Sequence, residues 1–282
     1  MSARGVGLGL ALAIGCGGSQ LNNTPPTPAQ ILKLRPYELR VPPTPSTAPR
    51  PLVIGLHGYA SSAPDFESEW QLGPETDARG ALYTALDGTD DRQGNEVWNA
   101  TPNNNLYPYD LLYLDAVIED VASKQPLDRK RIYVVGISNG AFMAYKAACE
   151  LSPKVAAILS LSGQSPVDAK LCHATTPVNI LEVHGDHDAD IAYDGSGGPG
   201  AKEEITTWGQ WNGCAGKLVA TGAAVDVDVD LPGAETVVSA VQGCPAGGAS
   251  ELWTVKNGVH HPNLVAGWPK MVMDWLLAHP KP

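Results

Sequence analysis

Short apolar runs alternate with amphipathic segments along most of the chain. Continuous apolar runs are typical of strands buried on both faces of a parallel sheet, and apolar positions spaced by three and four are typical of covering helices. The runs predict strands at 52–56, 81–86, 131–135, 155–161, 178–183 and 251–255. Helices are predicted at 110–124, 139–151, 202–211 and 269–278. The alternation predicts an α/β domain in three layers, with a mostly parallel central sheet flanked by helices.

Four local features refine this pattern. Asp110 can cap the helix that starts there, and Pro269 is tolerated in the first turn of the closing helix. Residues 37–41 predict an edge strand that ends before two prolines. Residues 225–230 alternate strictly between apolar and acidic, which predicts a strand with one wet face.

The N-terminal segment differs from the rest in composition. A short apolar run follows Arg4 and predicts a signal peptide over 1–18, too short to span a membrane. The same segment resembles a lipoprotein processing box with Cys16 as the lipidated residue, so a lipid anchor and free secretion both remain open. Residues 19–33 are polar and proline-rich and predict a tether. Residues 34–282 then form a single domain large enough for a sizeable core.

Charge and cysteine content narrow the possible partners and the compartment. The formal net charge of −11 argues against nucleic acid and anionic membrane surfaces, because both repel an acidic protein. Four cysteines remain beside Cys16, and an even number in an exported chain predicts two disulfides. Three pairings are possible, of which we favour the local ones, Cys149–Cys172 and Cys214–Cys244.

A candidate nucleophile lies in the segment Gly136-Ile137-Ser138-Asn139-Gly140. The segment joins a predicted buried strand to a predicted helix, which is the context of a nucleophile elbow. An ordinary strand-to-helix turn with a capping serine is the simpler alternative. We predict that the turn exposes the Ser138 hydroxyl above the edge of the sheet.

A serine hydroxyl needs a base to take its proton, and the base needs a carboxylate to orient it. After such an elbow the acid follows the nucleophile along the chain, and the histidine comes last. Asp188 is the predicted acid, because it follows the strand over 178–183, with Asp186 and Asp190 as alternatives. His260, after the last strand, is the predicted base, with His261 as its alternative.

The reaction also needs backbone N–H donors for the oxyanion of the intermediate. One predicted donor is the N–H of Asn139, directly after the nucleophile. The other is the N–H of Tyr59, in the His57-Gly58-Tyr59 turn that follows the strand over 52–56. Gly58 lets this backbone approach the substrate closely.

Five segments together carry a family resemblance that spans nearly all of the predicted domain. They are Leu56-His57-Gly58-Tyr59, Leu86-Asp87-Gly88-Thr89 with the run 94–100, the elbow, His184-Gly185-x-x-Asp188 and Gly258-x-His260-x-Pro262. With them the chain resembles exported serine esterases of the α/β-hydrolase fold, in the family that groups polyhydroxybutyrate depolymerases with feruloyl and acetyl-xylan esterases.

The resemblance implies a catalytic triad of Ser138, Asp188 and His260. It also implies that Trp98 and Asn99 border the active-site cleft. We expect these two residues to contribute to substrate binding together with three others near the triad, which are His57, Gly58 and His261.

The function so implied is hydrolysis of carboxylic esters through an acyl-enzyme, on a plant cell-wall ester or an aliphatic polyester. No cofactor is expected. The acidic run 226–230 lacks the glycine and glutamate of a calcium loop, and His184 and His187 do not lie in a zinc-binding HExxH helix. A catalytically silent surface-anchored binding protein of the same fold and a serine peptidase are the alternatives.

Overall fold

The computed structural model describes residues 25–100, 109–165, 172 and 174–282. The predicted signal peptide, with Cys16, and the first part of the predicted tether lie outside this range. The strands are β1 (Arg50–Leu56), β2 (Leu82–Leu86), β3 (Thr89–Asp90), β4 (Glu96–Val97), β5 (Leu127–Ile137), β6 (Ala157–Leu161), β7 (Asn179–Gly185), β8 (Leu218–Val225), β9 (Thr236–Val241) and β10 (Ser250–Val255). The helices are α1 (Pro28–Leu34), α2 (Ala63–Trp70), α3 (Leu72–Ala78), α4 (Asp110–Lys124), α5 (Asn139–Glu150), α6 (Ala201–Trp211) and α7 (Trp268–Ala278).

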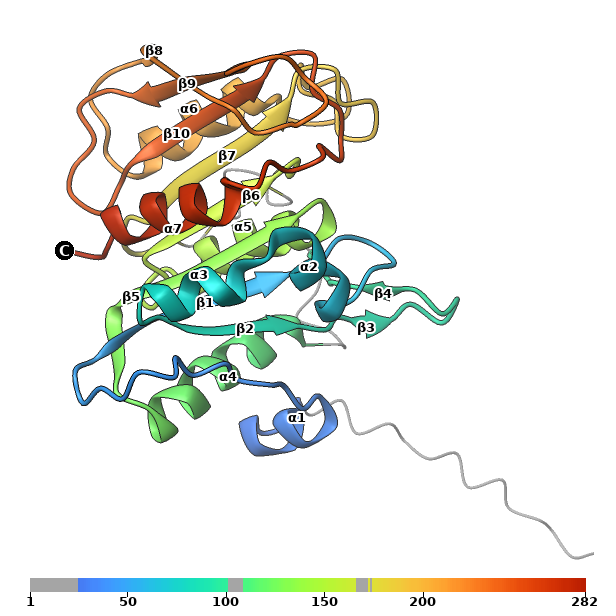
Figure 1. The fold of residues 1–282 in the computed structure, drawn as a ribbon, viewed down its shortest axis with the longest axis vertical. Coiled ribbons are helices and arrows are strands. Elements are labelled where there is room, and N and C mark those ends of the chain that lie inside the picture. Colours follow the sequence, from blue (N-terminus) through green and yellow to red (C-terminus); the bar gives the residue numbers. More distant parts are fainter. Residues whose placement is uncertain (1–24, 101–108, 166–171, 173) are drawn as a thin grey trace, which may run out of the picture.

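Eight strands form one sheet in the order β2-β1-β5-β6-β7-β10-β9-β8. Pairing is parallel from β2 through β10, and only β9 and β8 run antiparallel to their neighbours. Strands β3 and β4 form a separate small hairpin beyond the end of β2 (Figure 1). The six strands and four helices predicted from the apolar pattern are present with small shifts of their ends.

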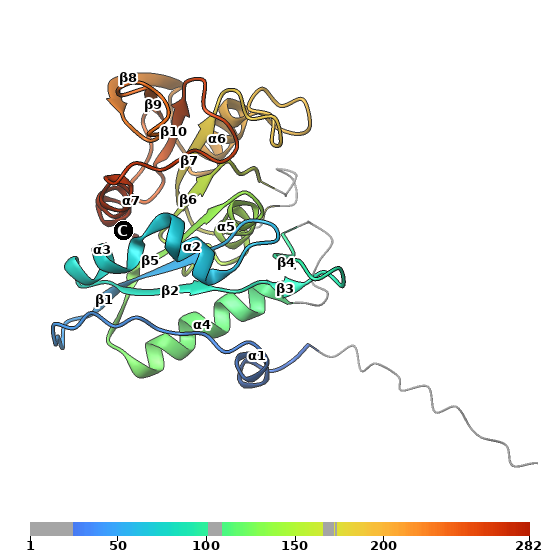
Figure 2. The same cartoon turned by 45° about the vertical axis from the view of Figure 1, so that its right-hand side comes forward.

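Helices cover both faces of the sheet (Figures 1 and 2). Alternate residues of β1 enter two different cores, because successive side chains of a strand point to opposite faces. Leu52 and Ile54 pack in the core that includes α4, α5 and α6, whereas Val53 packs in the core with α2 and α7. The predicted three-layer arrangement is confirmed, and the molecule has the α/β-hydrolase fold.

The parallel strands bring four chain segments to one edge of the sheet. The segments follow β1, β5, β7 and β10, and they carry all the residues predicted for the triad and the oxyanion turn. Carboxyl ends of parallel strands are where ligands bind in open α/β sheets. The fold therefore gathers the candidate residues without any long loop having to cross the sheet.

Part of the predicted tether is helical instead. Helix α1 begins within it, where Thr27 and Gln30 form a reciprocal capping box and Pro28 occupies the first turn. Ile31 is buried in the core with α4. A segment predicted to be a polar tether therefore packs against the domain through Ile31 and the partly buried Leu32.

The predicted edge strand over 37–41 is reduced to one antiparallel bridge between Arg40 and Tyr83 of β2. The prediction that Asp110 caps α4 is wrong, because Tyr109 is the capping residue and makes no side-chain cap. The Asp110 carboxylate instead accepts hydrogen bonds from Arg35 (2.5 Å) and from the backbone N–H of Asn99 (2.6 Å).

The predicted strand over 225–230 is wrong beyond its first residue. Asp228 Oδ1 accepts the N–H of Asp230 (3.1 Å), and the Leu231 N–H donates to the Asp228 carbonyl (3.1 Å). Aspartates that bond their own following backbone favour turns over strands. The strand of this region is β8, which is exposed along most of its length, so it shows no alternation of apolar and polar positions.

Helices α2 and α3 were not predicted, although α2 has a sequence signal. Ser62 caps it by accepting the N–H of Asp65, and Pro64 lies in its first turn. Phe66 and Trp70, one turn apart, are its buried side chains. Across the described residues, no helix combines the length and the apolar character needed to span a membrane.

Candidate active site

Ser138 lies at a sharp turn between β5 and α5, with φ 51° and ψ −120°. The turn is close-packed, because a Cβ on Gly136 would lie 2.5 Å from the Gly140 backbone, and one on Gly140 would lie 2.2 Å from the Leu56 carbonyl oxygen. Only glycine fits at either position. A non-glycine residue with positive φ is strained, and here the surrounding backbone holds it in place.

The hydroxyl of Ser138 is linked to a histidine and a carboxylate. His260 Nε2 lies 2.9 Å from Ser138 Oγ, and His260 Nδ1 lies 2.7 Å from Asp188 Oδ2. Both Asp188 and His260 are 7% exposed. The loops that carry them follow β7 and β10, which are adjacent parallel strands, so their side chains meet although 72 positions separate them.

The residues predicted as alternatives to Asp188 and His260 make contacts outside the triad. Asp186 accepts the N–H of Asn257 (2.6 Å) and pairs with Lys256, so it fixes the loop after β10. Asp190 is exposed and contributes its backbone N–H to Asp188. His261 is exposed, and its ring packs edge-on against His260 with centroids 4.8 Å apart.

Asp188 is surrounded by donors. Its Oδ1 accepts the N–H groups of Asp190 (2.9 Å) and Ile191 (2.8 Å), while Oδ2 faces His260. Burial raises the pKa of this carboxyl, but hydrogen bonds from His184 and His260 outweigh burial and hold the pKa well below its usual range. Asp188 is therefore ionised wherever the protein is folded at neutral pH.

The predicted oxyanion donors flank Ser138. Tyr59 N–H and Asn139 N–H make no hydrogen bond to another described residue, whereas the N–H of Ser138 itself donates to Leu161 O (2.9 Å). A Cβ on Gly58 would lie 3.6 Å from the Ser138 Cβ, so the turn after β1 passes close to the nucleophile. Two free backbone donors thus border the reacting hydroxyl.

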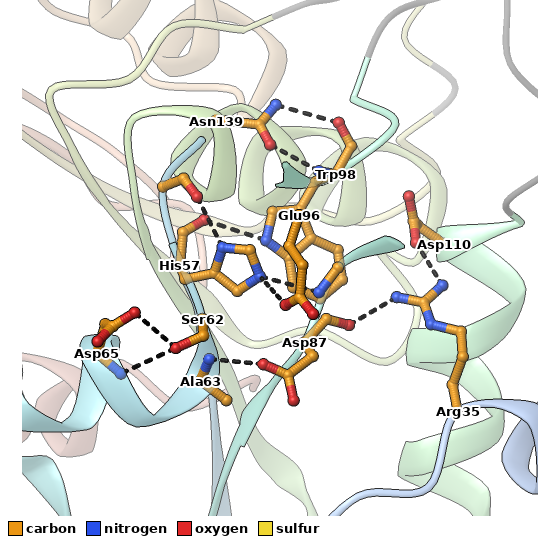
Figure 3. Close-up of polar contacts among 12 residues, drawn as sticks. Arg35, His57, Ser62, Ala63, Asp65, Asp87, Glu96, Trp98, Asp110 and Asn139 are labelled. Atoms are coloured by element: carbon orange, nitrogen blue, oxygen red, sulfur yellow. Dashed lines mark hydrogen bonds and ion pairs between the residues drawn. The ribbon is translucent and has the colours of Figure 1, made fainter. Parts of the chain in front are cut away.

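Figure 3 shows how this turn is held. His57 Nδ1 lies 2.6 Å from the Gly58 carbonyl oxygen, and His57 Nε2 accepts the N–H of Gly88 (2.9 Å). Burial lowers the pKa of His57, which keeps the ring neutral. The Trp98 indole N–H donates to the carbonyl of His57 (3.1 Å). The turn is therefore held by neutral hydrogen-bonding groups, the His57 imidazole and the Trp98 indole.

Asn139 adds a connection that the sequence analysis missed. Its side-chain oxygen accepts the Trp98 N–H (2.6 Å), and its side-chain amide donates to the Trp98 carbonyl (3.1 Å), as Figure 3 shows. Asn139 therefore binds the backbone of Trp98, whose indole in turn supports the oxyanion turn. Only an asparagine directly after the elbow serine hinted at this, since a carboxamide can donate and accept at once.

The side chains of His57 and Trp98 are 0% and 3% exposed, so the expectation that they bind substrate needs correcting. Both are positioned to support the turn. Gly58 is buried as well, so the exposed His261 and the partly exposed Asn99 remain the candidates for substrate contact. The carbonyl of Asn99 accepts a hydrogen bond from Lys146 (2.9 Å), which fixes its backbone.

Both predicted disulfides are present. Cys149 of α5 is bonded to Cys172, and Cys214 is bonded to Cys244 across the base of the β8–β9 hairpin. They close chain segments with sequence separations of 23 and 30 residues. Both are local, as the sequence analysis favoured.

Two clusters in the described part of the chain bring three ligand-type atoms together, His57–Asp87–Glu96 and Asp188–Asp190–His260. The ring nitrogens of the first histidine are taken up by Gly58 and Gly88, and those of the second by Asp188 and Ser138. Neither cluster offers a metal a free imidazole nitrogen. A cavity of about 760 Å³ lies along the open edge of β2 and is lined by none of the triad residues.

Comparisons with known proteins agree with the fold. A family model described as phospholipase/carboxylesterase matches residues 105–197. Feruloyl esterase B of Piromyces equi is 31% identical over 180 residues, covering 59% of this chain and 33% of that protein. Feruloyl esterase C of Emericella nidulans is 28% identical over 237 residues, covering 77% of this chain and 80% of that protein.

The structure of an acetyl xylan esterase from Aspergillus awamori superposes with a TM-score of 0.62 at 14% identity, covering 85% of this chain and 93% of that one. At that identity the likeness shows the fold alone. The chain spans 48% and 33% of the length of the first two curated relatives that it matches. The resemblance to feruloyl esterases is confirmed by the two sequence relatives.

Proposed function

We propose that the protein is a serine carboxylic-ester hydrolase that works through an acyl-enzyme on Ser138. The observation that carries this proposal is the continuous chain of contacts from Asp188 through His260 to Ser138, with distances of 2.7 Å and 2.9 Å. The N–H groups of Tyr59 and Asn139, which bond to no other residue in the described part of the chain, supply the remaining requirement for acyl transfer. The names of the relatives, which are esterases, support the same reaction.

In the proposed reaction Ser138 Oγ attacks the ester carbonyl carbon while His260 Nε2 takes the hydroxyl proton. The N–H groups of Tyr59 and Asn139 donate to the oxyanion. The intermediate collapses as the C–O bond to the alcohol breaks, and His260 gives the alcohol its proton. Water then attacks the acyl-enzyme with His260 as base, which releases the carboxylic acid and restores the Ser138 hydroxyl.

Asp188 stays ionised throughout this cycle. Its role is to hold the His260 ring in the tautomer whose Nε2 faces Ser138, and to stabilise the imidazolium that forms in each half-reaction. The low pKa of Asp188 fits this role, because a protonated carboxyl would no longer balance the imidazolium charge.

For the substrate we propose a feruloyl or acetyl ester of a plant cell-wall polysaccharide. Relatives named feruloyl esterase and acetylxylan esterase/xylanase support this choice. Comparative turnover of methyl ferulate, acetylated xylan and a 3-hydroxybutyrate oligomer decides it. If the 3-hydroxybutyrate oligomer is turned over fastest, the proposed substrate becomes an aliphatic polyester instead of a cell-wall ester.

The activity itself is tested with a short p-nitrophenyl ester and the Ser138→Ala variant. We expect turnover by the wild type, inactivation by a serine-directed phosphonate and loss of turnover in the variant. A folded wild type that is inert on every ester would leave a silent binding protein of this fold. Cleavage of peptides with no cleavage of esters would make it a serine peptidase.

We further propose that the protein is exported, with residues 34–282 as its catalytic domain. The two disulfides support an oxidising compartment. The intact mass of the mature protein tests both the cleavage site and lipidation of Cys16. A mature N-terminus at Cys16 with added acyl mass would establish the anchor, and an unmodified N-terminus would establish free secretion.

A further inference from the structure

Behind the triad lies a second pair of ionisable side chains that the proposed reaction does not use. Glu182 and His184 are two positions apart on β7, so their side chains share one face of the strand. They are 0% and 1% exposed. His184 Nδ1 lies 2.9 Å from Glu182 Oε1. An ion pair this deeply buried needs a reason, because it costs more to desolvate than an exposed one.

Both ring nitrogens of His184 face oxygen atoms. Nδ1 faces the Glu182 carboxylate, and Nε2 lies 2.9 Å from the Ile191 carbonyl oxygen and 3.2 Å from Asp188 Oδ2. A neutral imidazole has one N–H and would turn a lone pair toward one of these acceptors. The protonated ring satisfies both sides. Burial opposes this charge, but the hydrogen bonds to Asp188 and Glu182 raise the pKa of His184 to about 10.

Glu182 is arranged as the anion of this pair. Its Oε2 accepts the hydroxyl of Tyr145 (2.9 Å), and its Oε1 accepts the N–H of Gly163 (3.2 Å) in addition to facing His184. Burial raises the pKa of Glu182 above its ordinary value, although His184 and the Tyr145 hydroxyl act in the opposite direction, so the anion depends on its partners. The charge of one partner offsets that of the other, so the pair adds a dipole with its positive end at Asp188.

Other groups near the pair do not supply this charge. From α5 comes only the Tyr145 hydroxyl, and from the loop before α6 comes Tyr193, whose ring packs edge-on against His184 at 5.7 Å and whose hydroxyl bonds Thr254 of β10. Glu204 of α6 interacts with Glu182, and burial raises the pKa of Glu204 to about 8, so it is protonated at neutral pH. His260 is reached only through Asp188.

We infer that the buried Glu182–His184 pair is a positioning device of the triad, in which His184 as an imidazolium fixes Asp188 Oδ2 toward His260 and presents the positive end of the pair to Asp188. This inference rests on the proposed function. Asp188 Oδ2 receives His260 at 2.7 Å on one side and His184 at 3.2 Å on the other, so the carboxylate cannot rotate without losing a partner. The acid limb of the pH–rate profile is then set in part by two residues that never touch substrate.

Two near-isosteric variants shift that limb in opposite directions. His184→Gln removes the cation, and Glu182, left buried alone, takes up a proton. The uncompensated Asp188 then favours protonated His260, so the acid limb of kcat/KM moves to higher pH by roughly half a unit or more. Glu182→Gln leaves the His184 cation unbalanced while it remains protonated, so the limb moves to lower pH. The double variant behaves like His184→Gln.

The matched control is His187→Gln, the same substitution three positions further on, where the side chain is exposed and only the backbone N–H is bonded, to Gly258 (2.9 Å). Its profile should equal that of the wild type. Two results would overturn the inference and make the pair merely structural. One is lower activity in the test variants with no shift in the acid limb of kcat/KM. The other is a shift of that limb in the same direction in both variants.

A measurement on the wild type does not depend on the folding of any variant. In ¹⁵N-histidine NMR spectra at pH 8, one histidine should keep two protonated ring nitrogens. The signals of this histidine should vanish in His184→Gln. If that variant does not fold, cross-peaks with the neighbouring Glu182 assign the signals to His184. Neutral-imidazole shifts for His184 at pH 8 would overturn the inference even in an active esterase. An inert wild type that still shows the imidazolium would instead overturn the proposed function.

Discussion

The acid–base side and the oxyanion side of the candidate site are held by different kinds of interaction. On the acid–base side, Asp188 is held by His260, by backbone N–H groups and by a second histidine, and all these contacts involve charge. On the oxyanion side, the turn at Tyr59 is held by a neutral imidazole, an indole N–H and a carboxamide. Changes on the first side should alter pH dependence, and changes on the second should lower turnover equally at all pH values.

The largest effect is expected on the charged side, from Asp188→Asn. An amide in place of the carboxylate selects the wrong tautomer of His260, so kcat on a p-nitrophenyl ester should fall by about 10⁴-fold. Asp190→Asn is the control, since the Asp190 carboxylate lies near His260 but only its backbone N–H bonds to Asp188, and its loss of activity should be far smaller than that of Asp188→Asn. Equal losses in the two variants would contradict the assignment of the acid.

A smaller effect is expected on the neutral side, from Asn139→Ala. The backbone donor remains, but both side-chain bonds to the Trp98 backbone are lost. A displaced oxyanion turn should lower kcat roughly 10- to 100-fold, less than the loss of a donor would, with KM and the shape of the pH profile kept. A shifted acid limb in this variant would break the distinction between the two sides.

Trp98→Phe should have a smaller effect still. It keeps the buried ring but removes the indole N–H that donates to the His57 carbonyl. One neutral hydrogen bond is worth about 1 kcal/mol, so kcat should fall roughly fivefold. Trp211→Phe is the matched control on α6, away from the turn, and steady-state kinetics of the two variants make the comparison. A larger loss of kcat in Trp211→Phe than in Trp98→Phe would contradict the role of Trp98 in supporting the turn.

The last prediction concerns stability in acid, where Asp188→Asn is expected to change the pH dependence of unfolding, apart from its effect on turnover. Hydrogen bonds from His184 and His260 hold the pKa of Asp188 below its unfolded value against the opposing effect of burial. Ionised Asp188 therefore stabilises the folded state above about pH 4, and this contribution is lost as pH falls further toward the folded pKa. Urea unfolding should show the gap in free energy between wild type and Asp188→Asn narrowing below about pH 4. A gap that widens there would reverse the sign of the pKa shift.

The sequence predicted the parallel part of the sheet because those strands are buried on both faces and read as continuous apolar runs. It missed β8, which is exposed along almost its whole length, and misread the run around Asp228, whose side chain closes a turn. Apolar periodicity reports burial, so it fails wherever an element is formed by backbone pairing alone.

In the site, chain order and the ends of strands predicted Ser138, Asp188 and His260, and the three meet in the structure. The same reasoning could not find the roles of Asn139 and His184, which come from contacts between distant segments. Burial also separated residues that a motif groups together, since His57 and Trp98 are enclosed while Tyr59 is 56% exposed. A motif identifies which residues matter, and packing decides what each one does.

The most direct test of the central claim is to find where an acyl or phosphonyl group becomes attached. The protein is treated with a serine-directed phosphonate and then examined by intact mass and peptide mapping, beside Ser138→Ala. We predict one adduct per chain, on Ser138, that abolishes ester hydrolysis and is absent from the variant. Attachment to another residue, or ester hydrolysis that continues in Ser138→Ala, would contradict the account.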